Sequence, residues 1–437
     1  MTITIVAFLV LFALMALRVP IAFAMGLVGF AGFGFLVNWN AAAAMVANTA
    51  YETGMTYSLA VVPMFILMGN LITQAGLSRQ LYDASYALLG HYRGGLAMAT
   101  ILACGGFSAI CGSSLATAAT MAKVSMPSMR QYGYAPTLAG GSIAAGGTLG
   151  ILIPPSVILI IYGLMTEQDI GKLFIAGLLP GLLGILFYLA AVVVVTWINP
   201  KAGPPGRRQT MAERLRALRD VWAIAALFIL VIGGIYGGVF TPTEAAGIGA
   251  FGALVITLAR RVLTWRLFFN ILVETGRTTG MVFAVVIGAV IFSNLINMAQ
   301  TPLMLTEWIT SQGFSPLAVI FVIVVIYLVL GCVMESMSMI LLTVPVFYPI
   351  VAALDFSFMM PPEMVLIWFG IVVVVVTEIS LITPPVGMNV FVISAVIPDV
   401  TAGTIYKGVT PFWIMDIVRL ALLIMVPWIS LWLPSMM

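Results

Sequence analysis

The chain has 437 residues, of which 62% are hydrophobic and 8% are charged, and its mean hydropathy is +1.17. A soluble chain carries about 25% charged residues, so this composition excludes a sizeable soluble domain. The net charge of +3 is not gathered into a soluble basic face, which excludes a nucleic-acid-binding protein. The sequence therefore predicts an integral membrane protein.

Apolar runs of about 20 residues, the length that crosses a bilayer, recur from end to end. The first run lacks a basic n-region and a clean cleavage site, so we interpret it as a membrane helix rather than a signal peptide. The fold class predicted is an all-α polytopic membrane protein. Its expected membrane segments are residues 2–17, 20–38, 58–76, 95–130, 136–166, 173–198, 221–240, 244–259, 277–299, 316–352, 363–397 and 411–435.

Two of these segments are interrupted midway by small and polar residues. Segment 95–130 contains Cys111-Gly-Ser-Ser114, and segment 316–352 contains Glu335-Ser-Met-Ser338. A break at membrane depth is tolerated where protein or a water-filled cavity surrounds it. We therefore expect both segments to form re-entrant helical hairpins.

Two other segments are too long for one straight crossing and contain a proline pair. Pro154-Pro155 lies in segment 136–166, and Pro384-Pro385 lies in segment 363–397. Proline removes a backbone donor and clashes with the preceding turn. Both segments are predicted to be broken helices, and such breaks in corresponding places of two halves indicate a transporter's substrate and ion site.

A linker rich in Pro, Gly and Arg, residues 199–220, divides the chain into residues 1–198 and 221–437. Each half is expected to contain three crossings, an amphipathic connector, a hairpin, a broken helix and a final crossing. The connectors, about 77–93 and 300–313, have the character of helices that lie in the membrane interface. Because the first half starts outside and the second inside, the repeat is predicted to be inverted, as in alternating-access carriers.

The basic residues orient the chain. With the N-terminus outside, all of the 18 Lys and Arg except Lys172 are expected at or near the inner face, including Arg419. This asymmetry follows the positive-inside rule. The first hairpin is then on the inner side, the second hairpin is on the outer side, and the linker is cytoplasmic.

Six stretches, taken in this order, resemble the large (M) membrane subunit of tripartite ATP-independent periplasmic (TRAP) transporters. They span both halves: Leu17-Arg-Val-Pro20, Val62-Pro-Met-Phe-Ile-Leu-Met-Gly69, Gly112-Ser-Ser114, Gly150-Ile-Leu-Ile-Pro-Pro-Ser156, Thr241-Pro-Thr-Glu-Ala-Ala246 and Leu381-Ile-Thr-Pro-Pro-Val-Gly-Met-Asn389.

The resemblance implies two partners, a small membrane (Q) subunit and a soluble periplasmic substrate-binding protein. It implies import of a small organic anion, such as a C4-dicarboxylate or sialic acid, across the bacterial inner membrane. The coupling ion would be Na⁺ and the motion that of an elevator. A stand-alone sodium-coupled divalent-anion carrier, with inverted halves but no binding protein, remains the alternative.

Sodium prefers hard oxygen ligands, and a broken helix offers free carbonyls where its dipole is negative. Following the family pattern, the first sodium site would combine Ser108, Ser113, Ser114, Gly150, Ile153 and Pro154. The second would combine Gly331, Ser336, Ser380, Thr383 and Val386. Ser380 stands where the family usually has glycine, so it would either crowd an ion or add a hydroxyl ligand. These small residues could also simply let helices pack closely.

The anion is expected between the two hairpin tips, near the half-helix N-termini that follow the breaks. Its expected contacts are Ser156, Glu335 and Asn389. Glu335 and Glu378 are the acids nearest the breaks, and each is either functional or a helix cap. No arginine is expected at the membrane centre, so the sequence identifies no carboxylate clamp.

An enzyme is not expected. The single histidine, His91, lies in a connector rather than in the bundle, where a serine protease would need it. The three cysteines have no metal-ligand spacing. A channel would also use re-entrant loops, and saturable sodium-dependent uptake would distinguish a carrier from it.

Overall fold

The computed structural model describes residues 2–437, and every regular element in this range is a helix. The α-helices are α1 (Thr2–Ala16), α2 (Ile21–Leu36), α3 (Trp39–Met55), α4 (Val61–Gln74), α5 (Leu77–Leu89), α6 (Gly95–Cys111), α7 (Ser114–Gln131), α8 (Pro136–Thr148), α9 (Val157–Thr166), α10 (Ile170–Ile198), α11 (Met211–Asp220), α12 (Trp222–Tyr236), α13 (Pro242–Ala259), α14 (Trp265–Met298), α15 (Thr301–Ser311), α16 (Pro316–Gly331), α17 (Ser336–Ala352), α18 (Val365–Ser380), α19 (Met388–Val396), α20 (Ala402–Met425) and α21 (Trp428–Leu431). Short 3₁₀ turns cover Tyr57–Ala60, Leu149–Ile151, Pro200–Ala202, Pro362–Met364 and Pro434–Met436.

The all-helical membrane fold predicted from the sequence is confirmed. Within residues 2–437, six helices are long and apolar enough to cross a membrane, or up to seven if the bent pair α11 and α12 counts as one span. Helix α3 was not predicted, because its Ala-rich sequence favours a helix but is too polar for a membrane segment. Helix α14 begins at Trp265, earlier than residue 277, because Glu274 and Arg277 lower hydropathy without breaking a helix.

Both predicted hairpins are broken where polar residues interrupt the apolar sequence. Helix α6 ends at Cys111, and Gly112 turns the chain with a φ of 61°, in the left-handed region that favours glycine. Ser113 then caps α7 by accepting a hydrogen bond from the backbone N–H of Ala116. In the second hairpin, α16 ends at Gly331 and α17 begins after Glu335. In each hairpin the two helices pack against each other.

Both proline pairs break a helix. The first broken helix consists of α8, the turn Leu149–Ile151 and, after the pair, α9. The second consists of α18 and α19, which are separated by residues 381–387. Both Pro–Pro peptide bonds are cis. Each half therefore contains, in the same order, a connector helix, a hairpin, a broken helix and a long final helix (α5 to α10 and α15 to α20).

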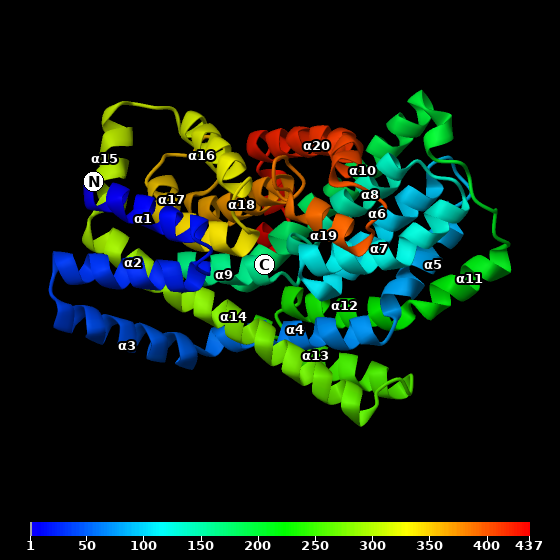
Figure 1. The fold of residues 1–437 in the computed structure, drawn as a ribbon, viewed down its shortest axis with the longest axis horizontal. Coiled ribbons are helices and arrows are strands. Elements are labelled where there is room, and N and C mark those ends of the chain that lie inside the picture. The colour runs from blue at the N-terminus through cyan, green and yellow to red at the C-terminus, as the bar shows by residue number, and fades with distance from the viewer. Residues whose placement is uncertain (1) are drawn as a thin grey trace.

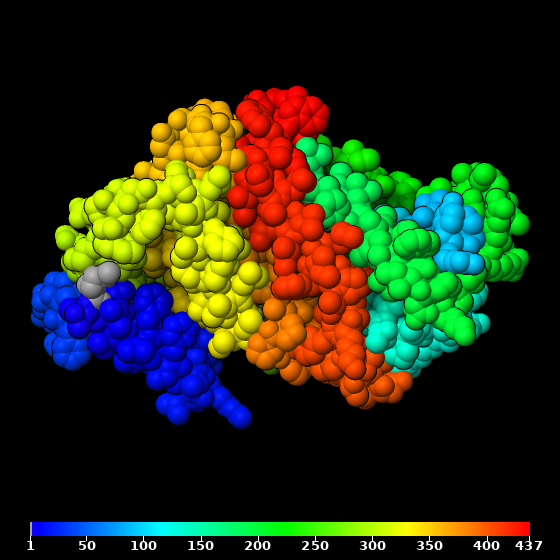
Figure 2. All heavy atoms as spheres, turned by 90° about the horizontal axis from the view of Figure 1, so that it is seen from above, coloured from blue at the N-terminus to red at the C-terminus, as the bar shows by residue number. Residues whose placement is uncertain are grey.

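The helices pack in two groups, which Figure 1 shows side by side. Helices α1–α4 and α12–α14 pack mainly on one another, through α2 on α14 and α4 on α13, and we call them the framework layer. The hairpins, broken helices and final helices (α6–α10 and α16–α20) form a second group, which we call the hairpin unit. In Figure 2, α20 forms an orange-to-red band across the molecule, and beneath it α20 packs on α8 and α10.

The linker is attached to the first half rather than free. Backbone N–H groups of Gly94 and Ala135 donate to the carbonyls of Gly203 and Ala202, at 2.8 and 2.9 Å. Helix α11 then packs along connector helix α5, as Figure 1 also shows. The linker therefore crosses the end of the first hairpin and is hydrogen-bonded to it.

Candidate functional site

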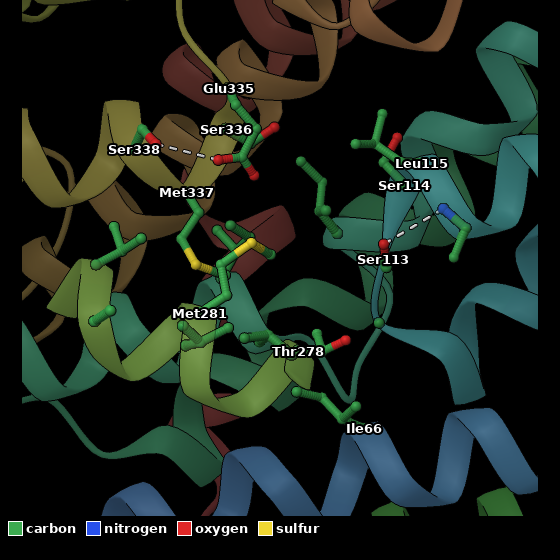
Figure 3. A pocket seen from close by; sticks show the side chains of 18 of the residues that line it. Ile66, Ser113, Ser114, Leu115, Thr278, Met281, Glu335, Ser336, Met337 and Ser338 are labelled. Atoms are coloured by element: carbon green, nitrogen blue, oxygen red, sulfur yellow. Dashed lines mark hydrogen bonds between the residues drawn. The ribbon is translucent and has the colours of Figure 1, made fainter. Parts of the chain in front are cut away.

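A cavity of about 620 Å³ lies between the framework layer and the two hairpin tips. Ser113 and Ser114 of the first tip face it from one side, and Glu335 and Ser336 of the second tip face it from another (Figure 3). Helices α2, α4 and α14 of the framework layer, together with Ile151 of the first break and the start of α9, complete the lining. The expected location of the anion, between the two tips, therefore coincides with a real cavity.

The cavity has an unusual charge pattern. Its lining includes Glu274 and Glu335 but no Lys, Arg or His. The positive potential comes instead from helix N-termini. The first residues of four helices line the cavity: Ser114 of α7, Ser336 of α17, Val157 of α9 and Ile21 of α2. The first backbone N–H groups of a helix have no partner within that helix, and they attract anions. The helix starts at the cavity are thus those at both hairpin tips, that of α9 after the first proline pair, and that of α2 in the framework layer.

The first hairpin tip touches the first broken helix at very short range. A Cβ added to Gly150 would lie 2.7 Å from the Ser113 carbonyl oxygen, and one added to Gly112 would lie 2.8 Å from the Pro155 carbonyl oxygen. Only glycine permits such an approach of two backbones. The structure thus brings together Ser113, Ser114 and Gly150, three of the residues predicted for the first sodium site.

Several carbonyls at the first break have no partner. Pro154 and Pro155 lack the N–H groups that would bond the carbonyls one turn earlier. Ser156 compensates at one position, since its hydroxyl donates to the Ile151 carbonyl at 2.5 Å. Within residues 2–437, no hydrogen bond reaches the carbonyls of Gly150, Ile153 or Pro154. The hydroxyl of Ser108 lies one turn before the tip and donates to Cys104 O at 2.6 Å.

The second hairpin tip touches the second break in a related way. Gly331 packs directly on the side chain of Ser380, so a Cβ at residue 331 would overlap the Ser380 Cβ. The Cys332 thiol lies 3.4 Å from the Pro384 carbonyl oxygen and donates to it. Ser380 therefore occupies space that is free because Gly331 has no side chain. The Ser380 hydroxyl donates to Thr377 O at 2.7 Å.

Most of the carbonyls exposed by the second break are bonded again. The N–H groups of Thr383 and Asn389 donate to the carbonyls of Ser380 and Leu381, at 3.2 and 3.1 Å. The Tyr406 hydroxyl lies within hydrogen-bond distance of the carbonyls of Pro385 and Val386. Thr383 donates to Ile379 O and accepts a hydrogen bond from Trp413 Nε1 at 3.0 Å. Ser336 lies at the cavity, apart from this group.

Of the three expected anion contacts, Glu335 lines the cavity, and the Ser338 hydroxyl donates to its Oε2 at 3.2 Å. The structure places the other two in the protein interior. Ser156 is fully buried and caps α9. Asn389 is also fully buried, where it accepts from the Ser114 hydroxyl at 3.0 Å and donates to the Ala144 carbonyl at 3.1 Å. Asn389 therefore ties the first tip to both broken helices.

A buried polar network was missed from the sequence, and it surrounds Arg419. This residue is fully buried within the protein, with its Nη2 2.5 Å from Glu378 Oε2 and 2.9 Å from Asp416 Oδ1. The Tyr188 hydroxyl donates to Asp416 Oδ2 at 2.6 Å and lies 3.0 Å from Thr148 Oγ1. We call these five residues the buried network.

The repeat contained a signal for this network. Thr148 and Glu378 each stand six residues before the proline pair of their half. Tyr188 and Arg419 each stand eight residues after Pro180 and Pro411, the prolines of the two final helices. Two corresponding positions from each half thus meet between α8, α10, α18 and α20.

Comparison with known proteins gives the family. The family described as "Tripartite ATP-independent periplasmic transporter, DctM component" matches residues 8–429. The C4-dicarboxylate TRAP transporter large permease protein DctM of Pseudomonas aeruginosa is 36% identical over 392 residues, which cover 89% of each chain. The isethionate TRAP transporter permease protein DctMQ of Oleidesulfovibrio alaskensis is 34% identical over 355 residues, 80% of this chain and 54% of that one.

The fold also has a solved counterpart. The crystal structure of the YdaH transporter of Alcanivorax borkumensis superposes with a TM-score of 0.61 over 91% of each chain, at 15% identity. The relatives are permeases, which confirms that the chain is not an enzyme. The chain belongs to the tripartite ATP-independent periplasmic transporter family, as a large permease (DctM) component.

Proposed function

We propose that this chain is the permease of a sodium-coupled, binding-protein-dependent importer of a small organic anion in the bacterial inner membrane. The observation that carries the proposal is the cavity between the two hairpin tips. The N-termini of α2, α7, α9 and α17 line that cavity, and Gly150 of the first break packs against Ser113 in its wall.

The charge pattern supports sodium coupling. An anion entering a cavity that contains Glu274 and Glu335 meets two carboxylates and no basic side chain. Like charges in a low-dielectric site repel strongly, so bound cations must contribute positive potential. The unpartnered carbonyls of Gly150, Ile153 and Pro154 are hard oxygen ligands of the kind that sodium prefers.

The relatives support the substrate class and the partners. Their names give C4-dicarboxylate and isethionate as substrates, and both names denote organic anions. The DctMQ relative, of which this chain covers 54%, has room for a second subunit, which supports a small Q subunit as partner. Family membership favours a soluble periplasmic binding protein over the stand-alone divalent-anion carrier.

The packing supports an elevator mechanism with inverted halves. The cavity lies at the boundary between the framework layer and the hairpin unit, so sliding of one against the other would carry the site across the membrane. The repeated order of connector, hairpin, broken helix and final helix provides one hairpin for each side.

The test is uptake into proteoliposomes that contain the permease and its small subunit. Candidate radiolabelled anions are offered with the cognate binding protein, with and without an inward sodium gradient. We expect saturable uptake that requires both the gradient and the binding protein. Uptake without the binding protein would establish the stand-alone carrier, and uptake indifferent to sodium would end the coupling proposal.

A further inference from the structure

The buried network connects the two helix breaks. At one end, Thr148 stands two residues before Gly150. At the other end, Glu378 stands two residues before Ser380 in the last turn of α18. Between them, Tyr188 belongs to the final helix of the first half, whereas Asp416 and Arg419 belong to that of the second. Every side chain in the network is completely or almost completely buried.

The network is not saturated with hydrogen bonds. Glu378 Oε1, Asp416 Oδ1, Arg419 Nε and Arg419 Nη1 have no hydrogen-bond partner within residues 2–437, although Asp416 Oδ1 lies near Arg419 Nη2. Buried polar atoms are usually paired, and each exception needs an explanation. Unused donors and acceptors on both sides of one guanidinium allow that group to exchange partners between the two carboxylates.

We propose that Tyr188, Asp416 and Arg419 are positioning residues through which the occupancy of one sodium site changes the sodium affinity of the other. This inference rests on the sodium coupling proposed above. A cation held at the second break attracts the Glu378 carboxylate and repels the Arg419 guanidinium. The guanidinium then moves toward Asp416, whose other oxygen holds the Tyr188 hydroxyl.

The far end of the network lies at the first break. Tyr188 also contacts Thr148, the last residue of α8, and the next turn of the chain contains the uncovered carbonyl of Gly150. A change in the Tyr188 bond therefore changes where that turn presents its oxygens. Because coupling between two binding sites is reciprocal, filling the first site must favour the second by the same factor.

The experiment is a sodium titration of the purified permease with its small subunit in lipid nanodiscs, with radioactive sodium as the probe. Tyr188→Phe removes one hydroxyl and leaves the Arg419–Glu378 ion pair in place. The matched control is Tyr162→Phe, because Tyr162 is equally buried and its hydroxyl donates to Leu366 O at 2.6 Å, outside the network. Thermal unfolding of both variants verifies that each is folded.

We expect cooperative binding by the native protein and by Tyr162→Phe, with a Hill coefficient well above unity. In Tyr188→Phe the two sites should separate, with a Hill coefficient near unity and a half-saturating concentration raised about 5-fold or more. A purely structural role would lower the unfolding temperature and leave the Hill coefficient unchanged, and that result would overturn the inference. Absence of saturable binding by the native protein would sink the sodium proposal itself, and with it this inference.

Discussion

The two helix breaks share a proline pair and a glycine contact with a hairpin tip, yet their environments differ. The first break is buried along its whole length from Leu149 to Ser156, whereas Pro384 and Pro385 of the second break are exposed. Within residues 2–437, several carbonyls at the first break have no partner, and at the second most are bonded again. Under the proposed sodium coupling, the first break would be preorganised for the ion, and the second would have to rearrange to hold one.

The side chains at corresponding positions near the two breaks also differ in charge. The first half contributes the neutral side chains of Thr148 and Tyr188, and the second contributes the charged side chains of Glu378 and Arg419 at corresponding positions. Charged groups respond to a nearby ion more strongly than hydroxyls do. The sodium coupling proposed above would thus combine a fixed site in the first half with a responsive site in the second.

The largest expected loss of folding stability comes from removing the guanidinium of Arg419, the buried positive charge of the second half. Arg419→Met would leave Glu378 and Asp416 buried without a cation, and breaking such a pair costs about 3–5 kcal/mol. Tyr188→Phe, at the corresponding position, removes one hydrogen bond to a charged group and should cost about 1.5–3 kcal/mol. Thermal unfolding of both variants in detergent measures the difference, and equal losses would contradict the contrast drawn here.

The next largest expected effect is at Gly150 of the first break. Gly150→Ala places a methyl group against the Ser113 carbonyl, and because backbone cannot move aside, overpacking should cost about 3 kcal/mol. Sodium-dependent uptake should be almost abolished. Gly26→Ala is the control, since nothing lies within 4 Å of a Cβ added there. Sodium dependence like that of the native protein in Gly150→Ala would remove the first break from the ion site.

A comparable effect is expected where the second break meets its hairpin. Gly331→Ala should cost about 3 kcal/mol, because its methyl group would overlap the Ser380 Cβ, an atom that no side-chain rotation moves. Ser380→Gly should restore stability and uptake in the Gly331→Ala background, since it removes the Ser380 side chain that the new methyl group would contact. A double-mutant cycle measures this interaction. Additive losses would show that Gly331 is required for another reason.

The sequence predicted where the helices break, because proline pairs and small polar interruptions act locally on the backbone. It predicted the contact of Ser113 with Gly150 through the family pattern. It could not predict that Asn389 and Ser156 face the interior, since the rotation of a short helix after a break depends on packing. The burial of Arg419 was missed because a positive-inside count treats every arginine as a surface charge, whereas this one has carboxylate partners on two helices.

The smallest expected effect tests whether the second break is the less organised site. Thr383→Val removes a hydroxyl that donates to Ile379 O and accepts from Trp413 Nε1, and the loss of each neutral hydrogen bond costs about 1 kcal/mol. We expect half-maximal uptake to need only a few-fold more sodium, and the tryptophan fluorescence to change because Trp413 loses its partner. Ser113→Ala is the matched change at the first tip, which removes the cap of α7 and should raise the sodium requirement further. If Thr383→Val proved the more damaging of the two, the second break would be the principal sodium site, and the order of the two sites would have to be reversed.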